Sequence, residues 1–339
     1  MTEASLISSY DALLADLDGV VYAGPHAIPG AVESLERLAG AGVALAYITN
    51  NASRSSEQVA AHLRELGAPA TAGQVFGSAL AGAELLATLV PEGSTVLVTG
   101  SQTLIDQVAA QGMIPVTSAE PTPAAVIQGF DPGLAWKDLA ETAYAVAGGA
   151  VWVATNTDLS IPQTRGIAPG NGALVAAVTA ATGETPVVAG KPEAPLFTTA
   201  AKHLGVSRPL VVGDRLDTDI LGGNRARMDT ALVLTGVDTA RTALAAVTDE
   251  RPRFLLASLA DLYEPYPDIT VVDGVHSCGT ASAWVERGVL HLTGQSESLE
   301  TWRAACSAWW SANPDITTAT QPELVMSDGP RVLAEDPQR

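Results

Sequence analysis

The chain has 339 residues, 47% of them hydrophobic, which is enough for two or three domains with sizeable cores. Its formal net charge of −19 gives a field that repels nucleic acids and anionic membranes, so neither is an expected partner. An anionic substrate would need a local positive charge, yet the sequence contains only three lysines, Lys137, Lys191 and Lys202. Each lysine is therefore worth examining for a role in a site.

Two features bear on the cellular compartment. Residues 1–9 lack a basic segment followed by an apolar run, and no stretch approaches eighteen apolar residues, which predicts a cytoplasmic protein. Cys278 and Cys306 match no metal-binding spacing, and a buried, reduced pair is expected.

The first predicted element is a strand formed by the apolar run that begins near Tyr10. It ends in Asp16-Leu17-Asp18-Gly19, which places Asp16 and Asp18 at the carboxyl end of a buried strand. In open α/β sheets ligands bind in the crevice at such strand ends. The alternative is that both aspartates only form a turn, because Asp and Gly are common turn residues.

The next elements continue this pattern. A helix is expected over residues 31–41, a strand over 43–48 and a second helix over 53–66. The strand stops at Thr49-Asn50-Asn51, whose small polar side chains and free amides suit an anion. Thr49 could equally be a helix-capping or turn residue.

A second α/β unit is expected from about residue 78 to residue 182, because alternating apolar runs and helical patterns restart there. The predicted helices cover 79–88, 102–111, 136–147 and 172–181, and the predicted strands cover 95–99, 124–128 and 151–154. Between the last strand and the last helix lies a long Gly- and Pro-rich loop that starts with Thr155-Asn156-Thr157-Asp158. A loop of this length in a compact domain is more often functional than idle.

Two further strand ends carry charged residues. A short strand over 187–189 runs into Gly190-Lys191-Pro192, and after a helix over 195–204 a strand over 209–212 runs into Gly213-Asp214, with Asp219 five residues later. Lys191 could be an exposed surface lysine, and Asp219 could only be a favourable charge at a helix amino end.

Taken together, these four strand ends resemble the motifs of the haloacid dehalogenase superfamily of phosphohydrolases. The match covers about residues 8–265. Within it, three segments resemble one branch of the superfamily, namely Thr155–Asp158, the loop over 162–172 and Gly190-Lys191-Pro192. This branch contains bacterial nucleotide phosphatases, 4-nitrophenylphosphatases, phosphoglycolate phosphatases and pyridoxal phosphatases. The resemblance implies a doubly wound, Rossmann-like parallel-sheet core of α/β class with an inserted α/β cap domain. The expected division is core 1–78 and 183–266, cap 79–182, and a small α+β accessory domain 267–339.

The accessory domain lies beyond the resemblance. Its sequence predicts strands over 269–272, 281–286 and 289–292, a helix over 298–310 and a further strand near Leu324. Its tryptophans require burial, so it is expected to be folded: Trp284, Trp302, Trp309 and Trp310. The order of these elements is compatible with part of an acetyltransferase-like fold. The segment lacks a glycine-rich pyrophosphate loop that would bind coenzyme A, however, which favours a structural role or the interface of a homo-oligomer.

The resemblance also implies a mechanism. Asp16 attacks phosphorus to form an aspartyl phosphate, Asp18 acts as general acid and then as general base, and Mg²⁺ is held by Asp16, by Asp214 and by the backbone carbonyl of Asp18. Lys191 tethers the nucleophile and the phosphoryl group, and Asp219 orients Lys191 or a metal-bound water. The remaining phosphoryl or substrate contacts are expected from a set of polar residues: Thr49, Asn50, Asn51 and Asn156.

The substrate is inferred from the loop over 155–172, which contains no aromatic residue to stack on a nucleobase or on pyridoxal. It offers groups that bind hydroxyls or a carboxylate: Gln163, Thr164, Arg165 and Asn171. This predicts a small phosphomonoester, glycerol 3-phosphate ahead of 2-phosphoglycolate. The alternatives are pyridoxal phosphate or nucleotides as substrates, a phosphotransferase, and a non-catalytic phosphate-binding protein.

Overall fold

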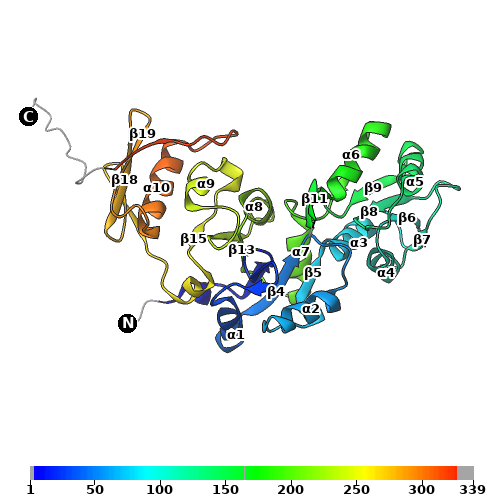
Figure 1. The fold of residues 1–339 in the computed structure, drawn as a ribbon, viewed down its shortest axis with the longest axis horizontal. Helices are drawn as coiled ribbons and strands as arrows, with labels where there is room; N and C mark the ends of the chain where they lie inside the picture. Colours follow the sequence, from blue (N-terminus) through cyan, green and yellow to red (C-terminus); the bar gives the residue numbers. More distant parts are fainter. Residues whose placement is uncertain (1–3, 164, 327–339) are drawn as a thin grey trace, which may run out of the picture.

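The computed structural model describes residues 4–163 and 165–326, in which three larger sheets follow one another along the molecule (Figure 1). The core sheet has six strands in the order β15-β14-β13-β1-β4-β5, and all its neighbours pair in parallel. Its strands are β1 (Ala12–Asp16), β4 (Ala44–Thr49), β5 (Val75–Gly77), β13 (Pro209–Gly213), β14 (Asp229–Val233) and β15 (Phe254–Leu256).

Helices cover both faces of this sheet, which confirms the doubly wound core. Neighbouring residues Leu13 and Leu14 are both fully buried but belong to different hydrophobic clusters, one on each face. Helices α1 (Ala31–Ala41) and α2 (Ser56–Glu65) pack on the first face, and α7 (Pro195–Leu204) packs on the second. Shorter helices complete the core: α8 (Leu221–Arg225), α9 (Ala240–Leu244), η2 (Ala72–Gln74), η4 (Thr248–Glu250) and η5 (Leu259–Tyr263).

The inserted unit is a second parallel sheet, with strand order β12-β9-β8-β6-β7. The strands are β6 (Thr95–Thr99), β7 (Ile114–Val116), β8 (Ala125–Gln128), β9 (Val151–Ala154) and β12 (Val187–Val188). Helices α3 (Ser78–Leu89) and α4 (Gln102–Ala110) pack on one face, and α5 (Trp136–Ala147) and α6 (Asn171–Thr182) pack on the other. Helix α3 also contributes Ala81 to a core cluster, so it joins the two units.

Two features of this region differ from the sequence predictions. Residues 187–188 were expected in the core, but β12 pairs with β9 and completes the cap sheet, so the chain returns to the core near Gly190. The predicted loop contains a hairpin of β10 (Ser160–Gln163) and β11 (Gly166–Pro169). Its Gly and Pro content hides the strand pattern, and side chains such as that of Ile167 are exposed rather than buried. A smaller hairpin, β2 (Tyr22–Ala23) with β3 (His26–Ala27), follows β1.

The third sheet belongs to the C-terminal unit and has the strand order β16-β17-β18-β19-β20. Its strands are β16 (Ile269–Val272), β17 (Val275–Cys278), β18 (Ala281–Glu286), β19 (Val289–Thr293) and β20 (Glu323–Met326), and helix α10 (Leu299–Ala312) packs on one face. Strand β17 was not predicted, because His276 and Ser277 interrupt its apolar pattern. The prediction of buried, reduced cysteines is confirmed, since Cys278 and Cys306 are both free and buried.

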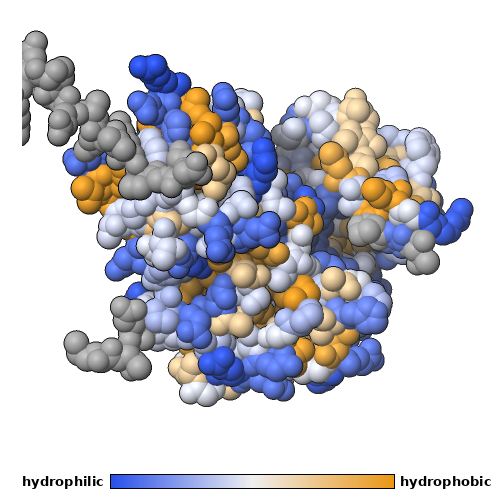
Figure 2. All heavy atoms as spheres, turned by 60° about the vertical axis from the view of Figure 1, so that its left-hand side comes forward, coloured by the Kyte–Doolittle hydropathy of each residue, from blue (hydrophilic) through white to orange (hydrophobic). Residues whose placement is uncertain are grey.

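The C-terminal unit packs tightly against the core. One hydrophobic cluster combines Leu290 and Trp309 of the C-terminal unit with Leu232 and Leu255 of core strands. The amino-terminal turn η1 (Leu6–Ser9), for which no element was predicted, also buries Leu6 and Ile7 against the core. Among the described residues, no helix combines the length and apolar character needed to cross a membrane. In the space-filling view, polar and apolar side chains are intermixed over the face that is seen (Figure 2).

Candidate active site

Three carboxylates meet at the carboxyl ends of the neighbouring strands β1 and β13. Asp16 is the last residue of β1, Asp214 directly follows β13, and Asp219 lies in the π-helical turn η3 (Leu216–Ile220). One carboxylate oxygen from each of the three lies within 4.8 Å of the others. Carboxylate oxygens are the hard ligands that Mg²⁺ and Ca²⁺ prefer, so the donor set fits a divalent cation.

Lys191 lies between two of these acids. Its Nζ is 2.5 Å from Asp16 Oδ1 and 2.7 Å from Asp219 Oδ1, and the residue is only 5% exposed. Burial by itself lowers the pKa of a lysine, but the two carboxylates outweigh this and raise the pKa of Lys191 above its usual value. The lysine therefore stays charged at neutral pH and supplies the local cation that the acidic chain requires.

The cluster still carries an excess of negative charge. Burial raises the pKa of Asp214 to about 6 and that of Asp219 to about 6, although Lys191 partly opposes both shifts. Burial also raises the pKa of Asp16 despite its ion pair with Lys191. One ammonium cannot balance three carboxylates of which two are buried and the third is partly buried, and a divalent cation would remove this electrostatic cost.

Three glycines allow the acids to approach the backbone so closely. A Cβ atom at Gly19 would lie 2.2 Å from Asp214 Oδ2, and one at Gly236 would lie 2.0 Å from the same atom. A Cβ atom at Gly213 would lie 2.1 Å from the Cβ of Asp219. Next to Gly236, the backbone N–H of Val237 donates to Asp214 Oδ2 at 2.7 Å. The contact of Gly236 and Val237 with Asp214 was not predicted. The only hint of it in the sequence is a glycine shortly after strand β14.

The second strand end lies beside the first, because β4 pairs with β1 and Ile48 is the partner of Asp16. Thr49 Oγ1 accepts a hydrogen bond from the backbone N–H of Asn51 at 3.1 Å. The Asn51 side-chain oxygen accepts from the backbone N–H groups of Ser53 and Arg54, which orders the turn before α2. The Thr49-Asn50-Asn51 segment is thus fixed next to the acid cluster.

The side chain of Asn50 holds the backbone of the catalytic-site lysine. Its oxygen accepts from the N–H of Lys191 at 2.8 Å, and its Nδ2 donates to the carbonyl of Lys191 at 3.1 Å. The family resemblance predicts that Asn50 contacts the phosphoryl group or the substrate. The side-chain contact with Lys191 adds a role that could not be inferred from the motif.

The cap residues predicted to bind substrate lie in two different environments. Asn156 donates to the carbonyl of Asn50 at 2.8 Å and accepts from the N–H of Asp158 at 3.2 Å, which places its side chain between the cap segment and the core. Its contact with the substrate stays a prediction. Asn171 is also buried, and it donates to the carbonyl of Asn156 at 2.7 Å. Arg165 and Gln163 are exposed at the turn of the β10–β11 hairpin, while Thr164 lies outside the described residues.

Asp18 opens to solvent at the rim of the cluster. Partial desolvation raises its pKa, while Lys191, His62 and Arg54 lower it. His62 on α2 also packs its ring edge-on against Tyr22, with 5.4 Å between the ring centroids. Neither His62 nor Arg54 was predicted to belong to the site, because nothing in the local sequence distinguishes His62 from other residues of helix α2 or Arg54 from other residues of the turn before it.

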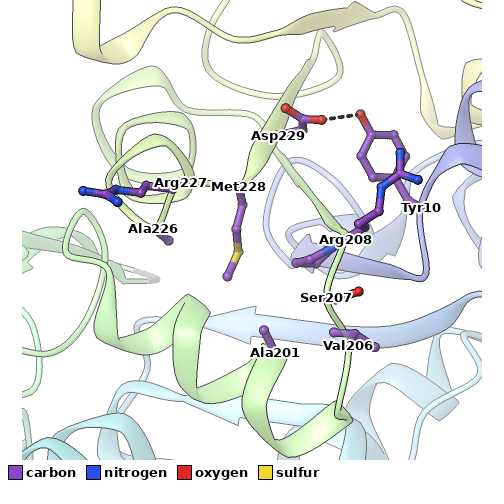
Figure 3. A pocket seen from close by; sticks show the side chains of 10 residues that line it. Tyr10, Ala201, Val206, Ser207, Arg208, Ala226, Arg227, Met228 and Asp229 are labelled. Atoms are coloured by element: carbon purple, nitrogen blue, oxygen red, sulfur yellow. Dashed lines mark hydrogen bonds between the residues drawn. The ribbon is translucent and has the colours of Figure 1, made fainter.

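A hollow of about 290 Å³ lies at the opposite edge of the core sheet, at the amino ends of β13 and β14 (Figure 3). Met228 and Tyr10 line it, and the Tyr10 hydroxyl donates to Asp229 Oδ2 at 2.8 Å. None of the acid-cluster residues lines this hollow. The acids lie at the other, carboxyl ends of the core strands. The candidate active site is therefore identified by its charged groups and not by this hollow.

The fold and the site together define a hydrolase of the haloacid dehalogenase type. The core is doubly wound, its first strand ends in an aspartate and its second in a threonine, and a buried lysine and a further pair of acids complete the site. Two family models agree: a haloacid dehalogenase-like hydrolase model matches residues 13–114, and a second model of the same kind matches residues 188–262. The chain belongs to this family.

Particular relatives narrow the comparison. A D-glycerol 3-phosphate phosphatase of Mycobacterium tuberculosis is 42% identical over 316 residues, which cover 91% of this chain and 88% of that protein. A crystal structure of a glycerol phosphate phosphatase from the same organism, in complex with magnesium, superposes with a TM-score of 0.86 at 40% identity and covers 96% of both chains. A 4-nitrophenylphosphatase-type structure from Geobacillus stearothermophilus has a TM-score of 0.68 at 34% identity but covers only 74% of this chain. These matches confirm the predicted branch of the family.

Proposed function

We propose that this protein is a Mg²⁺-dependent phosphomonoester hydrolase whose physiological substrate is glycerol 3-phosphate. The observation that carries the reaction type is the position of Lys191 Nζ, which contacts both Asp16 and Asp219 beside the third acid, Asp214. The choice of substrate is supported by the similarity to the D-glycerol 3-phosphate phosphatase over nearly the whole chain.

Asp16 is the nucleophile in this proposal. Lys191 Nζ binds its Oδ1 at 2.5 Å, which leaves the other carboxylate oxygen to attack phosphorus. The P–O bond to the leaving alkoxide breaks as the aspartyl phosphate forms, and water then cleaves the aspartyl phosphate to release inorganic phosphate. The positive charge of Lys191 lowers the repulsion between the carboxylate and the anionic phosphoryl group.

Asp18 supplies and removes the proton. Its raised pKa increases the fraction that is protonated near neutral pH, as a general acid for the leaving alkoxide requires. After it has given up the proton it can accept one from the attacking water in the second step. Its place at the rim, two residues after the nucleophile, allows both roles without displacing the buried acids.

Asp16, Asp214 and the backbone carbonyl of Asp18 would hold the metal ion. Asp219 is less available as a ligand, because its Oδ1 accepts from Lys191 and its Oδ2 accepts from the backbone N–H of Arg215 at 3.2 Å. When bound, Mg²⁺ offsets the negative charge shared by the acids and the phosphoryl group.

We also propose a cytoplasmic enzyme, because the two buried, unpaired cysteines suit a reducing compartment. The homo-oligomer expected from the sequence stays a prediction, which light scattering of the purified chain would test.

The test is steady-state kinetics of the purified full chain with Mg²⁺ and no added acceptor. Glycerol 3-phosphate, 2-phosphoglycolate, pyridoxal phosphate and a nucleoside monophosphate are compared by phosphate release. We expect the highest kcat/KM for glycerol 3-phosphate and loss of activity in excess EDTA. A preference for pyridoxal phosphate or the nucleotide would refute the substrate. Formation of a new phosphomonoester on an added acceptor alcohol, with no phosphate release in its absence, would indicate a phosphotransferase.

A further inference from the structure

An acid of the inserted unit reaches the core beside the active-site lysine. Asp158 follows cap strand β9, and both its carboxylate oxygens lie 3.1 Å from Nδ2 of Asn50. Asn50 follows core strand β4 and is 108 positions away in the sequence. In Figure 1 the hairpin that continues from Asp158 lies between the core and the cap sheet.

The partners of Asn50 fix the orientation of its side-chain amide. Its oxygen faces a donor, the backbone N–H of Lys191, while its nitrogen faces two acceptors, the carbonyl of Lys191 and the carboxylate of Asp158. A flipped amide would place donor against donor and acceptor against acceptor. Asp158 therefore favours the one orientation in which Asn50 binds both backbone groups of Lys191.

The segment that carries Asp158 is held with little freedom on its cap side. A Cβ atom at Gly170 would lie 2.2 Å from the carbonyl oxygen of Asp158, and one at Gly172 would lie 2.1 Å from that of Thr157. On its core side, a Cβ atom at Gly190 would lie 2.4 Å from the carbonyl oxygen of Thr155. Because these backbone contacts are so close, a shift of the cap segment would also move Gly190, the residue before Lys191.

Buried amides strengthen the same connection. Asn171, at the start of helix α6, donates to the carbonyl of Asn156 at 2.7 Å, and Asn156 donates to the carbonyl of Asn50 at 2.8 Å. Both side chains are at least nine-tenths buried. A continuous set of hydrogen bonds thus runs from the cap helix through Asn50 to Lys191.

We propose that Asp158 is a positioning residue of the reaction, which acts through Asn50 to place the Lys191 ammonium group against Asp16. Lys191 is then correctly placed only when the cap segment that carries Asp158 is packed against the core. The contact between the Lys191 ammonium group and Asp16 therefore depends on the position of the cap. This inference rests on the proposed phosphatase function, but it does not depend on which phosphomonoester is the physiological substrate.

A double-mutant cycle between Asp158 and Asn50 tests the proposal. The variants Asp158→Ala, Asn50→Ala and the double variant are assayed with Mg²⁺ on both glycerol 3-phosphate and 4-nitrophenyl phosphate. We expect Asp158→Ala to lower kcat by roughly ten- to hundredfold on both substrates, because small misplacements of a charged group are costly in the transition state. In the Asn50→Ala background the same change should alter kcat by less than about twofold, since Asp158 then has nothing to orient.

Controls separate positioning from a general loss of structure. Asp158→Asn keeps the side-chain volume and one acceptor oxygen but removes the charge, so it should lower kcat by less than Asp158→Ala does but by more than about twofold. This variant also covers the case that the alanine variant does not fold. Asp106→Asn, an exposed aspartate of cap helix α4, should keep the wild-type kcat. Thermal unfolding is measured for each variant.

The outcomes are distinct. Equal factors for Asp158→Ala in both backgrounds, or a kcat for Asp158→Asn within about twofold of wild type together with an unfolded alanine variant, would overturn the proposal. Hydrolysis of 4-nitrophenyl phosphate but not of glycerol 3-phosphate by the wild type would refute only the substrate, and the cycle would still be measured. A wild type that hydrolyses neither compound would overturn both proposals.

Discussion

The acid cluster and the β10–β11 hairpin lie close in the fold but are held in opposite ways. Lys191 and Asp219 are buried and paired with each other, and Gly213 packs against Asp219, whereas Ile167 and Leu159 at the hairpin are 82% and 70% exposed. Arg165 at the hairpin turn is likewise exposed. Groups that perform the chemistry are thus held in place by ion pairs and packing, while the side chains at the hairpin turn are exposed to solvent.

The largest expected effect comes from the preorganised region. Asp16→Asn removes the nucleophile while keeping the side-chain volume, so kcat should fall by at least about 10³-fold. Phosphate release and circular dichroism of the purified variant check this. A folded Asp16→Asn protein with wild-type turnover would rule out the aspartyl-phosphate mechanism.

A smaller but still large effect is expected from Gly236→Ala, which touches the cluster only through packing. Its Cβ would lie 2.0 Å from Asp214 Oδ2, so the carboxylate must move, and kcat should fall by roughly ten- to hundredfold. Gly40→Ala is the matched control, because Gly40 lies in helix α1 and has nothing within 4 Å of its Cβ position. Equal kcat values for the two variants would show that the placement of Asp214 is not critical.

The third prediction concerns the stability of the metal-free protein. Burial raises the pKa of Asp214 to about 6, above the value of 3.8 that applies when it is solvated. Above pH 6 the buried Asp214 carboxylate is charged and lowers the free energy of unfolding, by at most about 3 kcal/mol. This destabilisation decreases as the pH falls through 6, because the carboxylate becomes protonated. In EDTA, Asp214→Asn should melt at a higher temperature than wild type at pH 7.5, with a smaller difference at pH 5. An advantage that does not shrink at pH 5 would contradict the prediction.

The smallest effect should come from the hairpin. Arg165→Ala removes an exposed cation that can pair with the carboxylate of 2-phosphoglycolate but not with the hydroxyls of glycerol 3-phosphate. We expect kcat/KM for 2-phosphoglycolate to fall by about two- to fivefold more than for glycerol 3-phosphate, with an unchanged melting temperature. Lys137→Ala, an exposed cation on helix α5, is the control. Equal losses on both substrates would remove Arg165 from substrate discrimination.

The sequence by itself determined the parts of this protein that depend on local pattern. A buried strand followed by a charged or small polar residue is visible in a few consecutive positions, so the strand ends at Asp16, Thr49, Lys191 and Asp214 could be placed before the fold was known. The alternation of strands and helices likewise predicted both parallel sheets, because the spacing of apolar residues reports the face that each element buries.

The tertiary structure decided which distant groups meet. The hydrogen bonds between the Asn50 side chain and the Lys191 backbone join residues 141 positions apart, and those between Asp158 and Asn50 join residues 108 positions apart. Gly236, which follows another strand, lies against Asp214. Strand β12 was assigned to the wrong sheet for the same reason, since its two valines fit either sheet edge. Hydrogen-bond partners and close backbone contacts depend on how whole helices and strands pack against one another. A local sequence pattern does not predict that packing.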